Sequence, residues 1–355
     1  MPLLYLDHED VEHLLPMGEC IAVMERTLAD LARGSGVQPL RSVMWLDLGG
    51  RTGLLGMMPG QIGAAGGEPA AGIGGQPPAG AGGEPPAAAG SGVAGIKVIT
   101  LLPGNRERGE ESHLGMVLLF ETDFGRPIAY LDAAAITAIR TAAVSAVATR
   151  LLARPEAGDL ALLGAGVQAH THLAALREVR RLRRVRVWSR RPESARTFAA
   201  EAGERHGLRI EAVAEPAAAV AGADIVCTLT SSRIPVLQGG WLAPGAHVNA
   251  VGSCTPAARE LDSAAVARAR LFVDRRESTV NESGDYLIPL REGAIGEHHI
   301  LGEIGDLLLG KLEGRRDAAD VTLFKSLGLA VEDLAAAHHI YRRAQAEGRG
   351  QRLGG

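Results

Sequence analysis

Residues 160–170 read Leu-Ala-Leu-Leu-Gly-Ala-Gly-Val-Gln-Ala-His, and this stretch decides the fold. An apolar run of strand length ends in a glycine turn at residues 164–169, and a sequence typical of a helix follows. Gly164 permits a tight turn, Gly166 lets a pyrophosphate approach the backbone, and Ala169 lets the helix pack close to the sheet. The free N–H groups at the start of the helix then face the phosphates. The stretch predicts a dinucleotide-binding strand–turn–helix rather than an ordinary glycine-rich turn.

A second strand, residues 185–188, ends in Ser189-Arg190-Arg191. An NAD site usually carries Asp or Glu at this point, where the carboxylate binds the ribose hydroxyls and repels a 2′-phosphate. Here a hydroxyl and two guanidiniums take its place, and these groups suit a phosphate dianion. The alternative is a solvated basic turn, since arginine is frequent nearby. We expect NADPH as the cofactor, with NADH possible.

Strands and helices alternate from the alanine-rich helix at residues 133–153 to about residue 275, which predicts a doubly wound parallel sheet. The chain before it reads as a helix over residues 11–31, capped by Asp7, followed by mostly antiparallel strands. A further helix is expected over residues 327–346, and the tail from residue 348 onward looks frayed. We expect the strands of the antiparallel region at residues 37–45, 53–59, 93–102, 115–120 and 127–131.

A low-complexity insertion interrupts these strands at residues 63–92. Residues 66–89 are three eight-residue units rich in Gly, Pro and Ala. Such a segment buries almost no apolar surface and loses much chain entropy on ordering. We therefore expect a flexible insertion produced by repeat expansion and not a separate domain.

Composition excludes several classes of protein. The chain has 355 residues, a net charge of −4 and three cysteines. This balance gives no reason to expect nucleic acid or an anionic membrane as a partner, and no metal site or disulfide framework is expected. The N-terminus has no basic n-region followed by a long apolar stretch, and no membrane-spanning segment is expected. A reduced cytoplasm is the expected compartment.

Ordered motifs along nearly the whole chain carry a family resemblance. They include residues 38–41 (Gln-Pro-Leu-Arg), 56–59 (Gly-Met-Met-Pro), 97–100 (Lys-Val-Ile-Thr), 139–145 (Ile-Arg-Thr-Ala-Ala-Val-Ser) and 324–328 (Phe-Lys-Ser-Leu-Gly). On these motifs the chain resembles the ornithine cyclodeaminase/mu-crystallin family, and within it the ketimine reductase branch. The resemblance implies an α/β architecture in which a Rossmann domain, residues 133–318, is inserted in a mostly antiparallel α+β domain. That second domain, residues 1–132 plus 319–355, would bind substrate and pair with a second copy into a homodimer.

Three cations match the family positions that hold a substrate carboxylate: Arg41, Lys97 and Arg140. Two guanidiniums and an ammonium can neutralise and orient an α-carboxylate. Each alone could be a surface cation, but Lys97 lies in an apolar strand, and Arg140 lies in an alanine-rich helix where an unpaired charge is costly. We expect these three as the catalytic residues, with Lys97 or a water that it orders supplying a proton.

Cys254 departs from the cyclodeaminases. At the matching position those enzymes carry an aspartate, which handles the substrate amine during oxidation and ammonia loss. A neutral thiol is a poor base at pH 7, whereas reduction of a preformed imine needs no such base. Cys254 therefore favours a reductase, and we expect it and Glu282 to line the substrate pocket.

The resulting hypothesis is an NADPH-dependent reductase of cyclic ketimine carboxylates, either pyrroline-2-carboxylate or piperideine-2-carboxylate, giving L-proline or L-pipecolate. Alternatives are an ornithine cyclodeaminase, an alanine-type amino-acid dehydrogenase, or a non-catalytic, crystallin-like protein that binds NADPH. The expected cofactor contacts are Ser112, His113, Thr141, Gly164, Ala165, Gly166, Val167, Gln168, Ser189, Arg190, Arg191, Thr228, Val251, Gly252 and Ser326.

Overall fold

The computed structural model describes residues 3–49, 52–63, 92–109 and 111–354. The three eight-residue units at 66–89, and with them most of the expected insertion, lie outside the described residues. The chain divides into two compact units, which are treated separately below. Unit 1 comprises Met1–Arg140 and Leu329–Gly355, and unit 2 comprises Thr141–Gly328. Unit 2 was expected over residues 133–318, so both of its boundaries lie later in the chain than expected. The first boundary falls within the helix Ala133–Leu152, and the second follows the strand Thr322–Lys325.

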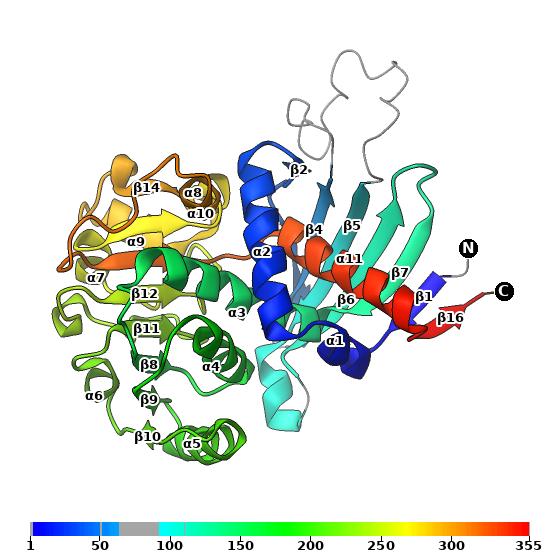
Figure 1. The fold of residues 1–355 in the computed structure, drawn as a ribbon. Coiled ribbons are helices and arrows are strands. Elements are labelled where there is room, and N and C mark those ends of the chain that lie inside the picture. Colours follow the sequence, from blue (N-terminus) through cyan, green and yellow to red (C-terminus); the bar gives the residue numbers. More distant parts are fainter. Residues whose placement is uncertain (1–2, 50–51, 64–91, 110, 355) are drawn as a thin grey trace. The chain divides into compact units, whose positions relative to one another are not determined.

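Unit 1 is built on an eight-stranded, mostly antiparallel sheet (Figure 1). Its central hairpins pair β4 with β5, β5 with β6 and β6 with β7, all antiparallel, whereas β1 runs parallel to β7. The expected antiparallel region is thus confirmed, with a break at Pro39–Arg41 between β2 and β3. The strands are β1 (Leu3–Leu6), β2 (Gly36–Val37), β3 (Ser42–Asp47), β4 (Thr52–Ile62), β5 (Val93–Leu101), β6 (His113–Glu121), β7 (Pro127–Asp132) and β16 (Gln351–Leu353). A short 3-10 turn, η1 (Pro103–Arg108), joins β5 to β6.

Helices α2 (Met17–Ala32) and α11 (Ala330–Glu347) pack on each other, and α11 lies across β4, β5 and β6. The single helix expected over residues 11–31 is wrong, because α1 (His8–Leu14) ends before Pro16 and α2 starts after it. Proline has no N–H to continue the hydrogen-bond ladder of α1 but is tolerated where α2 begins. The expected Asp7 cap is confirmed, since Asp7 accepts a hydrogen bond of 3.0 Å from the Asp10 amide.

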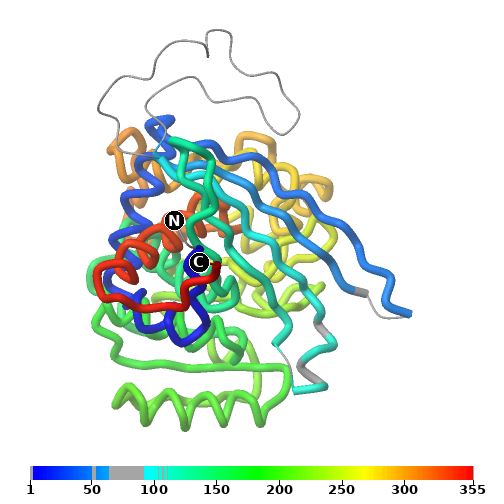
Figure 2. Tube along the Cα trace, turned by 90° about the vertical axis from the view of Figure 1, so that its right-hand side faces the viewer, coloured from blue at the N-terminus to red at the C-terminus, as the bar shows by residue number. Residues whose placement is uncertain are grey.

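The two ends of the chain meet in the sheet of unit 1. The expected frayed tail is wrong, because β16 pairs antiparallel with β1, with Leu3 opposite Leu353. Figure 2 shows the two termini side by side as a result. The pairing gives the tail backbone hydrogen bonds that its own Gly-rich sequence does not indicate.

Unit 2 is built on a second eight-stranded sheet whose neighbours all run parallel. Its order is β10-β9-β8-β11-β12-β15-β13-β14, so that β8 and β11 flank the point where the chain direction across the sheet reverses. The Rossmann-type doubly wound sheet is therefore confirmed. The strands are β8 (Asp159–Leu163), β9 (Arg184–Trp188), β10 (Ile210–Ala212), β11 (Ile225–Thr228), β12 (His247–Ala250), β13 (Arg270–Val273), β14 (Ile300–Glu303) and β15 (Thr322–Lys325).

Strand β8 shows why this sheet is covered on both faces. Its residues alternate between two hydrophobic cores, with Ala161 and Leu163 in one and Leu160 and Leu162 in the other. Such a strand is apolar on both sides, as buried parallel strands are. The covering helices are α4 (Val167–Val179), α5 (Pro192–His206), α6 (Pro216–Val220), α7 (Ser263–Ala267), α8 (Arg276–Glu282), α9 (Gly284–Arg291) and α10 (Ile304–Leu308), with short turns η2 (Gly239–Trp241) and η3 (Glu297–His299).

Helix α3 (Ala133–Leu152) runs from unit 1 into unit 2. It is long and apolar enough to cross a membrane by length and composition, contrary to the expectation that no segment would be. However, 78% of its most apolar window is buried within the protein, as in the core helix of a soluble fold. Its apolar sequence is therefore explained by packing.

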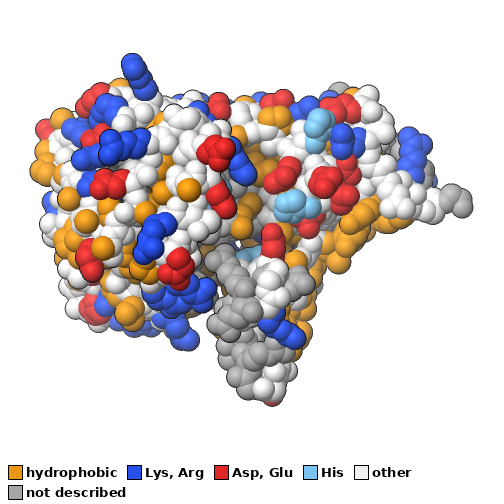
Figure 3. Space-filling model, turned by 90° about the horizontal axis from the view of Figure 1, so that it is seen from below, with side chains coloured by type: hydrophobic (Ala, Val, Ile, Leu, Met, Phe, Trp, Pro, Cys, Tyr) orange, Lys and Arg blue, Asp and Glu red, His pale blue; other side chains and the backbone are white. Residues whose placement is uncertain are grey.

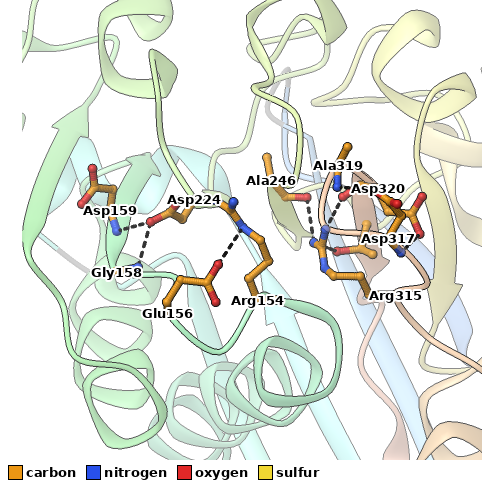
Figure 4. A network of polar contacts seen from close by, with 12 residues as sticks. Arg154, Glu156, Gly158, Asp159, Asp224, Ala246, Arg315, Asp317, Ala319 and Asp320 are labelled. Atoms are coloured by element: carbon orange, nitrogen blue, oxygen red, sulfur yellow. Dashed lines mark hydrogen bonds and ion pairs between the residues drawn. The ribbon is translucent and has the colours of Figure 1, made fainter.

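Arginine–carboxylate contacts brace the amino ends of the parallel strands (Figure 4). Asp224, directly before β11, accepts hydrogen bonds from the Gly158 and Asp159 amides at 2.9 and 3.0 Å. Arg154 lies 2.6 Å from the same carboxylate. The opposite edge, where the strands end, is free of this network and carries the glycine turn.

Candidate functional site

The glycine turn lies at the carboxyl end of β8, as expected. Gly164 has φ +122°, and a Cβ at this position would lie 2.5 Å from the Leu229 carbonyl oxygen. No other residue type fits without moving the neighbouring chain. Gly166 caps α4, so the first N–H groups of the helix are directed at the space over the turn.

Two of the predicted cofactor contacts carry buried polar atoms without a hydrogen-bond partner in the described part of the chain. These atoms are Thr228 Oγ1, at the end of β11, and Gln168 Oε1, in the first turn of α4. Buried polar atoms are normally paired, so two unpaired ones beside a helix N-terminus indicate a place for a ligand. Turn, helix and unpaired oxygens together fit a dinucleotide.

Ser189, Arg190 and Arg191 follow β9 directly, beside the glycine turn. The Gly164 amide donates to the Trp188 carbonyl oxygen at 2.8 Å, which joins the ends of β8 and β9. Arg190 and Arg191 are exposed, and Arg191 caps α5. Two guanidiniums at this strand end have the charge and the position needed to bind the 2′-phosphate of NADPH.

Further predicted contacts meet at the same edge of the sheet. The amides of Val251 and Gly252 donate to the Thr228 carbonyl oxygen at 3.1 and 3.0 Å, and the Ser326 amide donates to the Ala250 carbonyl oxygen at 3.0 Å. Thr141 is instead a buried residue of α3. Ser112 and His113 belong to unit 1, where their side chains lie 3.1 Å apart.

Cys254 and Glu282 come from neighbouring segments of unit 2. The Cys254 thiol is half-buried and donates to the Val251 carbonyl oxygen at 3.6 Å. Glu282 ends α8, and two residues later the Gly284 amide donates to the Thr255 carbonyl oxygen at 3.0 Å. The α8–α9 junction therefore lies against the loop that carries Cys254.

In unit 1, Lys97 and Arg140 share one carboxylate. Lys97 Nζ lies 2.6 Å from Asp333 Oδ2, and Arg140 Nε donates to Asp333 Oδ1 at 2.8 Å. Arg140 Nη1 also donates to Glu332 Oε2 at 2.7 Å. All four side chains are buried, at 0–3% exposure. The structure thus explains how Arg140 is tolerated in an apolar helix.

Strand β5 directs Lys97 at these carboxylates. Side chains two apart on a strand share a face, so Gly95 and Lys97 both face α11. A Cβ on Gly95 would lie 2.6 Å from the Leu334 side chain, which means that the glycine lets α11 approach closely. Asp333, the residue before Leu334, then reaches the lysine.

The charges of Arg140 and Arg41 act on Lys97, the third cation predicted to bind the substrate carboxylate. Burial, together with the neighbouring charges of Arg140 and Arg41, lowers the pKa of Lys97 to about 8, although Asp333 opposes the shift. Arg41 is thus close enough to act on Lys97 electrostatically.

Sequence reasoning missed Glu332 and Asp333. Both lie in the first turn of α11, where acidic residues are usually read as partners of the helix dipole. The signal that could have revealed them is their position in an otherwise apolar run, residues 329–337. All nine residues of this run are buried. A buried carboxylate needs a cation, and two of the predicted cations lie within contact distance.

Comparisons with known proteins agree with this architecture. Ketimine reductase mu-crystallin of Mus musculus is 37% identical over 341 residues, covering 95% of this chain and 96% of the mouse protein. A solved structure of Thermococcus litoralis Delta(1)-pyrroline-2-carboxylate reductase, in complex with NADH and L-proline, matches with a TM-score of 0.88 and 35% identity over 99% of this chain and 100% of that one. An archaeal alanine dehydrogenase dimer with bound NAD matches with a TM-score of 0.84 and 27% identity over 100% and 99%.

The family model of the ornithine cyclodeaminase/mu-crystallin family matches residues 84–348. This range takes in β5 with Lys97, the whole of unit 2 and the two carboxylates of α11. The family resemblance drawn from the motifs is thereby confirmed. The chain belongs to the ornithine cyclodeaminase/mu-crystallin family.

Proposed function

We propose that the protein is an NADPH-dependent reductase of cyclic ketimine carboxylates. The observation that carries the proposal is the buried cluster of Lys97, Arg140, Glu332 and Asp333, which keeps a lysine of lowered pKa beside a fixed guanidinium. Similarity to a ketimine reductase and to a pyrroline-2-carboxylate reductase supports it.

Substrate orientation is assigned to Arg41 and Arg140. Glu332 and Asp333 hold the planar guanidinium of Arg140 in place, so its N–H groups keep a fixed direction. The α-carboxylate of the imine is a natural acceptor for guanidinium N–H groups. Fixing a reactant in this way lowers the entropic part of the barrier.

Proton supply is assigned to Lys97. With a pKa of about 8, its ammonium is protonated at neutral pH and still loses a proton readily. The imine nitrogen takes this proton while the C=N carbon is reduced, so that C=N becomes CH–NH. NADPH supplies the hydride when bound at the carboxyl edge of the parallel sheet. Asp333 afterwards favours reprotonation of the lysine.

Cys254 separates this proposal from the alternatives. Oxidation of a free amino acid requires a base for the substrate ammonium, and a neutral thiol serves poorly as that base. This disfavours an ornithine cyclodeaminase and an alanine-type dehydrogenase. A non-catalytic binding protein has no use for a lysine of lowered pKa.

A substrate panel tests the function. Purified protein with NADPH is expected to reduce pyrroline-2-carboxylate or piperideine-2-carboxylate, followed at 340 nm, and to leave pyruvate with ammonia nearly untouched. Ammonia release from ornithine with NAD⁺ or NADP⁺, at a rate near that of imine reduction, would overturn the assignment. Cys254→Ser should retain most of the reductase activity, because one small neutral group replaces another.

We further propose that the protein is a homodimer that pairs the outer face of the unit 1 sheet. Leu114 and Met116 of β6 are 42% and 37% exposed, whereas Val117 and Leu119, on the other face, are fully buried. Met44 on the edge strand β3 is 50% exposed. The strand register places Met44 on the same face of the sheet as Leu114. Figure 3 shows hydrophobic side chains (orange) gathered in a band along one margin of the view. An apolar patch of this kind marks an interaction surface.

Light scattering after gel filtration tests the dimer. Met44→Glu with Met116→Glu should yield monomer, because two carboxylates would be buried unpaired in the interface. Ile234→Glu is the matched control, since Ile234 is 71% exposed and lies in unit 2. A dimer that survives the double substitution would contradict the assigned face.

A further inference from the structure

Three charged side chains lie buried together in unit 2: Glu260, Asp285 and Lys325, at 0, 3 and 1% exposure. We call this group the Lys325 triad. Lys325 Nζ lies 2.9 Å from Asp285 Oδ2 and donates to the Ser253 carbonyl oxygen at 2.6 Å. None of the three is among the predicted contacts of cofactor or substrate, so the proposed chemistry leaves them unexplained.

Both carboxylates of the triad bind backbone amides. Asp285 Oδ1 accepts from the amides of Glu260 and Leu261 at 2.8 and 3.0 Å. Glu260 Oε1 accepts from the amide and the hydroxyl of Thr230 at 2.7 and 2.6 Å, and Oε2 accepts from the Gly252 amide at 2.7 Å. The carboxylates therefore hold chain segments as well as the lysine.

These segments follow three neighbouring strands at one edge of the sheet. Thr230 comes after β11, Gly252 and Ser253 come after β12, and Lys325 ends β15. The carboxyl edge of a doubly wound sheet is where a dinucleotide binds. The triad thus ties together the loops that border the proposed cofactor site, including the loop that carries Cys254.

The loop has little room to adopt another conformation while the triad is intact. A Cβ on Gly252 would lie 2.2 Å from the Thr230 carbonyl oxygen and 2.7 Å from Glu260 Oε1. A buried ion pair is a weak source of stability compared with apolar packing. Its presence here, with every carboxylate oxygen used, points to a role in geometry.

We propose that the Lys325 triad is a positioning device that holds the loop of residues 252–254 in one conformation at the nicotinamide end of the cofactor site. The contacts described above support the claim that the triad holds the loop, whereas the expected effect on catalysis rests on the proposed function. A displacement of about 1 Å at a reacting centre can cost about 100-fold in rate. Loosening the loop should therefore lower kcat and leave the affinity for the distant phosphates unchanged.

The chain contains its own reporter for this loop. Of its three cysteines, Cys20 and Cys227 are fully buried at 0% exposure, whereas Cys254 is half-buried. Labelling of the native full-length protein with Ellman's reagent should therefore modify one thiol, and the rate should report the mobility of the loop without any turnover.

Lys325→Met is the test variant, and Lys311→Met, an exposed lysine of the same unit, is its control. We expect Lys325→Met to label one thiol at least fivefold faster, with kcat lowered 10- to 100-fold and the Kd for NADPH changed less than threefold. An unchanged labelling rate would overturn the proposal, whatever happens to kcat. The control should behave as wild type in every measurement.

Labelling of a second thiol would show that Lys325→Met unfolds unit 2, because the buried Cys227 lies in the same unit. In that case the variant Asp285→Asn provides the test. This variant keeps an oxygen for the Glu260 and Leu261 amides and weakens the pair with Lys325. Faster labelling of one thiol supports the proposal, and wild-type labelling overturns it. If the wild type proves inactive on ketimines, the proposed function fails, but the labelling rates still decide the positioning role.

Discussion

Lys97 and Lys325 are the same residue type at the same burial, 1% exposed, and each forms an ion pair with one aspartate. Burial lowers the pKa of Lys97 to about 8, whereas the pKa of Lys325 is raised although burial alone would lower it. The difference comes from the neighbours. Arg140 and Arg41 act on Lys97, and Asp285, Cys254 and Glu260 act on Lys325.

The comparison separates two uses of a buried ammonium. Lys97 loses its proton within reach of neutral pH and can take part in proton transfer. Lys325 stays charged throughout that range and can only hold its partners in place. Neither role follows from burial or from the ion pair alone, and only the sum of surrounding charges tells them apart.

Replacing Lys97 should produce the largest effect of any single change. Lys97→Met is expected to lower kcat/KM for the ketimine by about 1,000-fold or more, because it removes both a charge and a proton donor. NADPH binding, measured by fluorescence quenching, should remain near wild type. Lys97→Arg keeps the charge, so it should spare KM more than kcat. Near-normal turnover in both variants would show that Lys97 is not the proton donor.

The dependence of kcat on pH should distinguish the role of Lys97 from that of Lys325, and Asp333 provides the variant for this test. Because the proton donor is the charged form of Lys97, wild-type kcat should decline as pH rises through about 8. Asp333 raises the pKa of Lys97, so Asp333→Asn should move this decline to lower pH. Lys325→Met should leave the midpoint of the decline in place while lowering its plateau. Coincident profiles for wild type and Asp333→Asn would contradict the proposed coupling.

Local sequence pattern was enough to predict unit 2. Each feature that predicted it lies within fewer than ten consecutive residues: the glycine turn, the strand after it and the basic end of that strand. The structure places these features at one edge of the sheet. The family motifs likewise led to Lys97 and Arg140. Their assignment as clamp residues stays a prediction, since it depends on the substrate.

Long-range pairing is what the sequence could not predict. Arg140 and Asp333 are 193 residues apart in the chain, and no periodicity connects them. The same holds for β16 and β1, whose strands meet from opposite ends of the chain. The Lys325 triad joins three segments in this way too. Local patterns specify elements, whereas buried charge pairs depend on which elements meet.

A smaller effect is expected at the strand end of β9, on the cofactor side of unit 2. Arg190→Ala with Arg191→Ala should raise KM for NADPH about 10- to 100-fold, the loss of one charged hydrogen bond or two. KM for NADH should change less than threefold, because NADH lacks the 2′-phosphate. Equal efficiency of the wild type with both cofactors would contradict the predicted preference.

The smallest effect on activity should come from the opposite edge of the same sheet, where Asp224 braces the amino ends of the strands. Asp224→Ala removes the acceptor for two amides and for Arg154, and should lower the free energy of unfolding by about 1–3 kcal/mol, with kcat unchanged. Backbone hydrogen bonds hold the pKa of Asp224 below its ordinary value of 3.8 although burial opposes them, so its stabilising effect is present above that pH and is lost on acidification.

Glu156→Ala is the control, since Glu156 is 69% exposed and 3.7 Å from Arg154. Chemical denaturation at pH 7 and pH 3 measures both variants. A loss of activity in Asp224→Ala at full stability would show that the amino edge shapes the site as the Lys325 triad does.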